Sequence, residues 1–135
     1  MSAFGAAEYP TTLGLDPVIC AQKLGDYVKE NNFDGVDIDY EDNEAMNKGT
    51  GEQWVILFMR HLRKLLPYHI VTHAPQGPYF ANGYVNGGYR KIHKEVGQLI
   101  DFYNVQFYNQ LNATYEKYDL LFKNSGTFSP ETSIR

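Results

Sequence analysis

Three carboxylates occupy every second position of one short segment, at Asp37, Asp39 and Glu41. Successive side chains of a β-strand point to opposite faces, so a strand here would place all three carboxylates on one face. Like charges one pleat apart repel each other, and burial penalises each charged form. We therefore expect this row to share protons or to raise the pKa of at least one carboxyl, which keeps an acid protonated for general-acid catalysis. The alternative is the solvated polar face of an edge strand.

The opposite face of the same segment is apolar. It carries Val36, Ile38 and Tyr40, and Gly35 lies within the predicted strand. A later segment repeats the alternation, with Tyr103, Val105 and Phe107 on one face and Asn104, Gln106 and Tyr108 on the other. Each strand thus has an apolar face that can pack against helices and a polar face that cannot. This pattern favours a functional site on the polar face over the solvated face of an edge strand.

Short strand-like segments alternate with helical patterns along the chain. The expected strands cover residues 2–6, 33–40, 68–74 and 102–108. Their centres are about 34 residues apart, which is the size of a βα unit. The expected helices follow the cap Asp16-Pro17, cover 55–65 and 89–99, and begin again at Tyr115. Four such units predict an α/β fold with a parallel sheet.

Two architectures fit four βα units, a small doubly wound sheet or part of a (β/α)8 TIM barrel. Helices cover both faces of a doubly wound sheet, so its strands are apolar on both sides. The polar faces at 33–40 and 102–108 favour the barrel, where they would point inward. The last residues of these strands would then lie at the C-terminal rim, where barrel enzymes keep their chemistry. We predict a partial TIM barrel.

The segment at 34–41 reads DGVDIDYE and resembles the DGxDxDxE signature of family 18 glycoside hydrolases, the chitinases and related endo-N-acetylglucosaminidases. Three other segments are similar to the plant class III and fungal branch of that family, SAFG at 2–5, APQ at 74–76 and VQFYN at 105–109. The resemblance implies that residues 1–135 form a partial catalytic domain, which covers roughly the third to sixth βα units of the family.

The resemblance also implies a retaining, substrate-assisted hydrolysis of β-1,4-linked N-acetylglucosamine polymers. Its partner molecule would be chitin or a chito-oligosaccharide. Glu41 would be the general acid that protonates the glycosidic oxygen, while the carbonyl oxygen of the sugar's own N-acetyl group attacks the anomeric carbon. Asp39 would orient that acetamide, and Asp37 would share a proton with Asp39. Tyr108 would donate its hydroxyl to the acetamide carbonyl oxygen.

Three polar residues near the strand ends complete the predicted substrate-binding set, Gln106, Asn109 and Gln76. They would hydrogen-bond to the sugar or to the carboxylates. His73 lies near the same rim, but strand parity predicts that it faces the helices. Trp54 falls within a helix and is predicted to be a core residue rather than a sugar platform. The histidines show no metal-ligand spacing, so neither a metal nor a cofactor is expected.

Composition limits the partners. The chain has 135 residues, a net charge of −4 and a single Cys, which describes one domain without an intrachain disulfide. The basic residues are spread out, so no nucleic-acid partner is expected. No apolar run approaches the ~20 residues that a membrane span needs. Residues 1–5 lack the pattern of a secretion signal, although a longer family 18 parent would be expected outside the cell.

Four βα units are half of a complete barrel. The family's first two and last two strands have no counterpart in these expectations, nor does the Trp that the family places after its eighth strand. The open sheet edges would allow self-association. Two functions remain open, a chitinase-type hydrolase whose missing half comes from a second copy or another polypeptide, and an inactive fragment or carbohydrate-binding module that cannot close the site alone.

Overall fold

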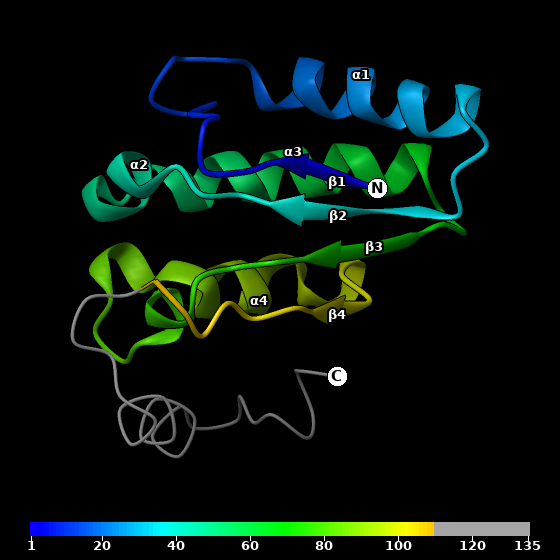
Figure 1. Cartoon of the computed structure of the whole chain (residues 1–135). Coiled ribbons are helices and arrows are strands. Elements are labelled where there is room, and N and C mark those ends of the chain that lie inside the picture. The colour runs from blue at the N-terminus through cyan, green and yellow to red at the C-terminus, as the bar shows by residue number, and fades with distance from the viewer. Residues whose placement is uncertain (110–135) are drawn as a thin grey trace.

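The computed structural model describes residues 1–109, and within them four parallel strands form one sheet (Figure 1). The strands are β1 (Ser2–Phe4), β2 (Gly35–Asp39), β3 (Ile70–His73) and β4 (Phe102–Tyr103), in the spatial order β1-β2-β3-β4. All three neighbouring pairs are parallel. Parallel neighbours need crossover connections, and helices supply them here. The predicted α/β fold with parallel βα units is confirmed.

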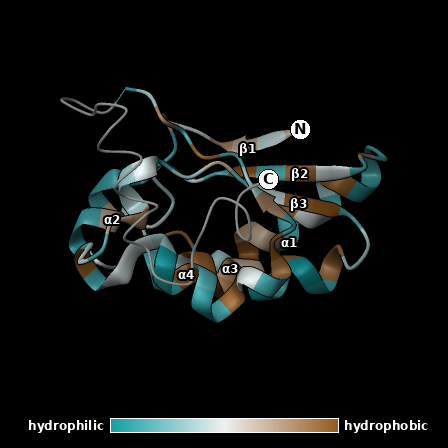
Figure 2. Ribbon diagram, turned by 90° about the horizontal axis from the view of Figure 1, so that it is seen from below, coloured by the Kyte–Doolittle hydropathy of each residue, from teal (hydrophilic) through white to brown (hydrophobic). Residues whose placement is uncertain are grey.

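The α-helices are α1 (Pro17–Glu30), α2 (Asn43–Lys48), α3 (Gly51–Leu65) and α4 (Gly88–Val96). Short 3-10 turns occur at η1 (Gly77–Phe80), η2 (Val85–Gly87) and η3 (Gly97–Leu99). Helices α1, α3 and α4 lie on the same side of the sheet (Figure 2). None of the described helices covers the other face, which is the one-sided arrangement of a barrel segment. In the described part of the chain, no helix has the length and apolar character needed to cross a membrane.

Helix α1 begins where the sequence predicts. The Asp16 side chain accepts hydrogen bonds from the backbone N–H groups of Val18 and Ile19, at 2.8 and 2.9 Å. Pro17 occupies the first helical position, where its missing N–H costs nothing. Helices α3 and α4 overlap the predicted segments 55–65 and 89–99, although α3 begins at Gly51 and α4 ends at Val96. The helix predicted to begin at Tyr115 lies outside the described residues.

The hydrophobic core lies between the sheet and these helices. As predicted, Val36, Ile38 and Tyr40 point into it, and their exposed fractions are 3%, 0% and 0%. Their buried neighbours come from the helices and from β3, namely Val28, Phe58, Leu62, Val71 and Ile92. Burial of the apolar face of β2 therefore fixes which face of that strand is left for the carboxylates.

Trp54 is a core residue, as predicted, with 5% of its surface exposed. Its ring stacks on those of Phe58 and Tyr40, with centroid separations of 5.1 and 5.7 Å. Its indole N–H donates to the carbonyl oxygen of Leu15 at 2.7 Å. This hydrogen bond ties the loop between β1 and α1 to the core.

His73 faces the helices, as strand parity predicts. It is fully buried, and its Nδ1 lies 3.0 Å from the Tyr89 hydroxyl oxygen. Burial lowers the pKa of His73 to about 3, so the imidazole is neutral at physiological pH. His73 therefore packs on the side of the sheet opposite the carboxylates.

The strands predicted at 2–6, 33–40 and 68–74 are shorter only at their ends, and two other local features differ more from the sequence expectations. The strand predicted at 102–108 is shorter, because β4 ends at Tyr103 and pairing resumes only in a bridge between Gln76 and Gln106. Pro75 has no N–H to donate, which interrupts the ladder next to it. Phe107, expected on the apolar face, is consequently 40% exposed. Helix α2 was not expected; it has six residues, too few to show a helical period.

Gly35 within the motif has a packing role. A Cβ at this position would lie 2.1 Å from the carbonyl oxygen of Ile70. Only glycine therefore allows β2 and β3 to approach each other at this point. The glycine of the signature thus serves the sheet that carries the carboxylates.

Candidate active site

The three carboxylates lie on the face of β2 that no described helix covers. Asp37 and Asp39 belong to the strand, and Glu41 follows its C-terminal end. All three are partly buried, in contrast to the fully buried side chains between them. The alternation predicted from the sequence is therefore present, and Glu41 lies at the rim of the parallel sheet.

Asp37 is held by three neutral donors from the neighbouring strands. The Thr72 hydroxyl donates a short hydrogen bond to Oδ1, and Asn104 Nδ2 donates to the same oxygen at 3.1 Å. The Ser2 hydroxyl donates to Oδ2 at 3.3 Å. Ser2 and Thr72 are the direct register partners of Asp37 in β1 and β3. The sheet itself thus solvates this carboxylate.

Asp39 has a raised pKa of about 6. Burial is the largest cause, followed by the charges of Glu41 and Asp37 and by a hydrogen bond with Glu41. A hydrogen bond from Gln106 Nε2 to Oδ1, 2.7 Å long, opposes the rise. Gln106 is itself fixed, because the same nitrogen donates to the carbonyl oxygen of Ala74 at 2.7 Å. The row therefore contains a carboxyl that exchanges its proton near neutral pH.

Glu41 receives a hydrogen bond from Gln76, whose Nε2 lies 2.9 Å from Oε2. Gln76 and Gln106 are paired through their backbones, since Gly77 N–H donates to the Gln106 carbonyl oxygen at 3.0 Å. The two glutamines thus lie side by side, and each holds one carboxylate of the row. Both were predicted from the sequence to bond either the sugar or the carboxylates.

Tyr108 and Asn109 are at the end of the described residues. Tyr108 is 58% exposed and lines a hollow of about 560 Å³ together with Asp37, Asp39 and Gln106. The structure therefore brings this predicted residue to the row. Asn109 is exposed, has a positive φ of 61° and is not among the residues that line this hollow.

Phe4 is kept away from the carboxylates by an unusual backbone conformation. Its register partner is Asp39, so regular strand geometry would place its ring on the carboxylate face. Its φ is instead 71°, which a bulky residue adopts at a cost in strain. The ring packs edge-on against Trp54 and Phe58 on the helix side, with centroids 5.8 and 5.6 Å apart. The carboxylate face remains open beside Asp39.

The donors to Asp37 were not predicted as site residues. Thr72 and Asn104 have the strand parity of the carboxylate face, so the alternation could have identified them. Their side chains are short and neutral. A search of the sequence for acids, bases and nucleophiles therefore does not single them out.

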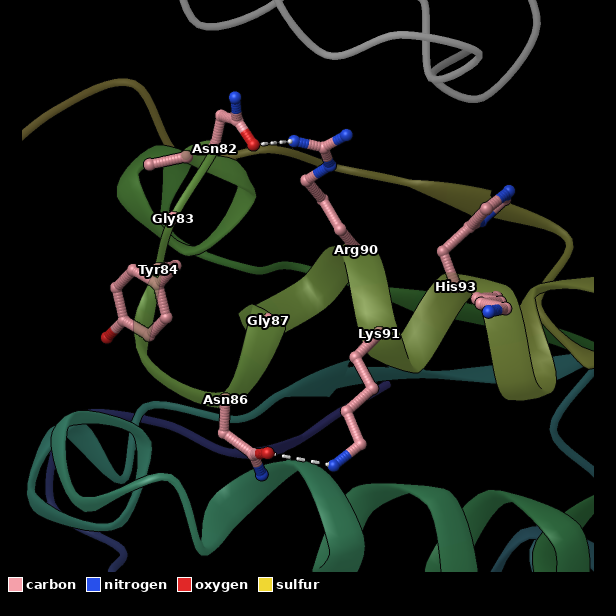
Figure 3. Close-up of a pocket in the computed structure, with 10 residues that line it drawn as sticks. Asn82, Gly83, Tyr84, Asn86, Gly87, Arg90, Lys91 and His93 are labelled. Atoms are coloured by element: carbon pink, nitrogen blue, oxygen red, sulfur yellow. Dashed lines mark hydrogen bonds between the residues drawn. The ribbon is translucent and has the colours of Figure 1, made fainter.

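A separate hollow of about 620 Å³ lies between the segment at 81–87 and helix α4 (Figure 3). Arg90 Nη1 donates to Asn82 Oδ1 and Lys91 Nζ donates to Asn86 Oδ1, each at 3.0 Å. None of the three carboxylates lines it. Asp37 and Asp39 instead line the hollow beside Tyr108, and Glu41 lines neither of the two hollows.

Within residues 1–109, no three His, Cys, Asp or Glu side chains are grouped so that they could hold a metal ion. The described groups that could act chemically are an acid at the strand end, Glu41, and a proton-sharing carboxyl beside it, Asp39. Both belong to the row on the sheet face that no described helix covers. This arrangement can donate a proton to a leaving oxygen and stabilise a developing positive charge.

Comparison with known proteins shows which family the chain resembles in sequence and fold. The family model described as glycosyl hydrolases family 18 matches residues 19–131. The chain is similar to the crystal structure of a GH18 chitinase from Pseudoalteromonas aurantia, with 37% sequence identity and a TM-score of 0.82. That match covers 99% of this chain and 53% of the chitinase, so the chain spans about half the length of this relative. No curated protein matches.

Proposed function

The chain belongs to glycosyl hydrolases family 18, and from this premise we propose that it performs chitinase-type hydrolysis of β-1,4-linked N-acetylglucosamine polymers. The observation that carries the proposal is the row Asp37-Asp39-Glu41, with its acid at the C-terminal rim of a barrel-type sheet. That rim is the catalytic end of TIM-barrel enzymes. Among the described residues, Asp39 is the carboxyl with a raised pKa, and it lies in the same row as the strand-end acid Glu41.

Glu41 is the proposed general acid. Its carboxyl lies at the end of β2, and Gln76 donates to one of its oxygens at 2.9 Å. A carboxyl oriented in this way can deliver its proton to the glycosidic oxygen as the bond to the anomeric carbon breaks. Gln76 fixes the orientation of the acid without neutralising it by an opposite charge.

Asp39 is proposed to orient the substrate's acetamide and to stabilise the positive charge that develops on it. In a substrate-assisted reaction the acetamide carbonyl oxygen attacks the anomeric carbon, and positive charge develops on the acetamide nitrogen. An ionised carboxylate beside that N–H stabilises the charge. The raised pKa of Asp39, about 6, means that its charge depends on its neighbours. Asp37, held by Thr72 and Asn104, is the neighbour of Asp39 on the same face, and its charge raises the pKa of Asp39.

Tyr108 is proposed to hold the acetamide carbonyl oxygen by donating its hydroxyl. Its exposed side chain lines the same hollow as Asp39, which is the position that this role requires. Gln106 holds Asp39 through the hydrogen bond from its Nε2 to Oδ1. Asn109 is the remaining residue proposed to contact the substrate. Positioning the internal nucleophile in this way replaces a second protein carboxylate as the nucleophile.

A carbohydrate-binding module that does not hydrolyse its ligand is the second candidate function. The observation that favours it is the uncovered sheet face, together with the 53% coverage of the related chitinase. In the described residues β1 and β4 each pair on one side only. Unpaired edges recruit other strands, so we propose that an active form associates with a second chain through them.

Hydrolysis of a 4-nitrophenyl chito-oligosaccharide tests the proposal directly. We expect the purified chain to release 4-nitrophenol, and light scattering to assign the activity to a species heavier than the monomer. A monomer that binds chitin beads and releases nothing would support the binding module instead. A chain that neither binds nor cleaves the polymer would contradict both functions.

A further inference from the structure

Glu41 lies within a short segment, Tyr40 to Asn43. The other three side chains of this segment form hydrogen bonds with distant parts of the chain. Tyr40 and Asp42 are both fully buried, with 0% exposed. The Asn43 side-chain oxygen accepts a short hydrogen bond from the Tyr79 hydroxyl. Glu41 is thus the member of the segment that reaches the open face, and the residues on both sides of it are fixed.

Two consecutive threonines hold the residues that flank Glu41. The Thr11 hydroxyl lies 2.7 Å from the Tyr40 hydroxyl oxygen. Thr12 donates twice to Asp42, through its backbone N–H to Oδ2 at 2.7 Å and through its hydroxyl to Oδ1 at 2.6 Å. Both threonines belong to the loop between β1 and α1, about thirty residues away in the sequence.

Burial of the Asp42 carboxylate carries a large desolvation free energy. A carboxylate without solvent must be satisfied by donors, or its desolvation destabilises the fold. Its donors are Thr12 and the N–H of Ala45 at the start of α2, 3.1 Å from Oδ1. Asp42 thus joins the β1–α1 loop to the N-terminus of α2, and the peptide of Glu41 lies directly before this junction.

We propose that the Thr12–Asp42 pair is a positioning device that holds the Glu41 carboxyl beside Asp39. Its catalytic consequence rests on the proposed function, but its structural consequence does not. The pair adds the β1–α1 loop to a site whose other residues come from β2 and from the segments after β2, β3 and β4. The competing explanation is that the pair only stabilises the β1–α1 loop and has no effect on the position of Glu41.

The titration of Asp39 reports on this device without any substrate. The groups that face Asp39 are Asp37 from β2, Glu41 from the segment after β2 and the neutral amide of Gln106 from the segment after β4. The charge of Glu41 and its hydrogen bond both raise the pKa of Asp39. If Glu41 moves away, those contributions fall, and the midpoint of Asp39 falls with them.

The experiment is a pH titration of the Asp39 carboxyl carbon by NMR in the labelled full chain. We expect a midpoint near 6 in the wild type and a clearly lower one in Thr12→Val and Asp42→Asn. Thr12→Val replaces only the hydroxyl of an exposed residue, so it remains informative if Asp42→Asn fails to fold. Thr12→Ser restores the hydroxyl and should restore the midpoint.

Asp101→Asn is the matched control. Asp101 accepts the backbone N–H of Val71 at 2.7 Å, but it lies before β4, at the opposite end of the sheet. This variant should lose stability without moving the Asp39 midpoint. Midpoints in Thr12→Val and Asp42→Asn equal to the wild type, or an equal shift in Asp101→Asn, would overturn the proposal.

Kinetics separate this proposal from the proposed function. A misplaced acid lowers kcat and leaves substrate binding intact, so Thr12→Val should lower kcat about tenfold or more with little change in KM. Absence of hydrolysis in the wild type would contradict the proposed function and leave the NMR result to decide on the positioning device. A shifted Asp39 midpoint with unchanged kcat would show that the pair does not serve catalysis.

Discussion

Substitution of Glu41 by Gln is expected to remove nearly all hydrolysis of a chito-oligosaccharide. The amide keeps the shape of the side chain and one acceptor for Gln76, which now donates at 2.9 Å. It has no acidic proton to give to the glycosidic oxygen. Loss of a general acid typically costs about 10²–10⁴-fold in rate, and we expect kcat to fall by that amount with KM little changed. The measurement is steady-state release of reducing ends from an unsubstituted chito-oligosaccharide, because its sugar leaving group needs the proton whereas 4-nitrophenolate does not.

The matched control is Glu44→Gln. Glu44 lies three residues further along, on the surface of α2, where its carboxylate pairs with Lys48. The same chemical change there should leave kcat unchanged and alter stability only slightly, since exposed ion pairs contribute little. If Glu41→Gln turned over substrate at the wild-type rate, Glu41 would not be the acid.

Substitution of Asp39 by Asn is expected to lower activity and raise stability at the same time. Loss of the carboxylate removes the charge that faces the acetamide N–H, and kcat should fall on the order of a hundredfold. The same change removes a charge that the folded protein tolerates poorly, since burial and the charges of Glu41 and Asp37 disfavour it. Functional sites often reduce stability in this way.

The sign of the pH dependence follows from the two states of Asp39. Its pKa is about 6 in the folded protein and near the ordinary 3.8 in the unfolded chain. The folded state therefore holds the proton more tightly, and ionisation destabilises it progressively as the pH rises from about 4 to 6. Thermal unfolding should give a higher Tm for Asp39→Asn than for the wild type above pH 6, and equal values below pH 4. A lower Tm above pH 6 would contradict this account.

The sequence alone predicted the face of each residue in β2 correctly. Side-chain alternation has a period of two, so a buried Ile38 necessarily places Asp37 and Asp39 on the other face. The same parity correctly assigned His73 to the helix side. These predictions succeeded because burial of one face leaves a strand no freedom of register.

Contacts between distant segments could not be predicted in this way. Nothing local indicates that Thr12 bonds Asp42, because the loop that brings them together has no period. Nor does the sequence indicate that Phe4 has a positive φ and packs its ring against Trp54, away from Asp39. The assignment of Gln76 to Glu41 and of Gln106 to Asp39 depends on a bridge after Pro75, where the regular ladder has already ended.

The most direct test of the account is whether hydrolysis depends on the substrate's own acetamide. The chain is offered 4-nitrophenyl β-chitobioside and 4-nitrophenyl β-cellobioside, which share linkage and leaving group and differ in the acetamide or hydroxyl at carbon 2. If the acetamide is the nucleophile that Asp39 and Tyr108 position, only the chitobioside releases 4-nitrophenol, by a margin of at least about a hundredfold. Equal release from both substrates, or release from neither, would contradict the account.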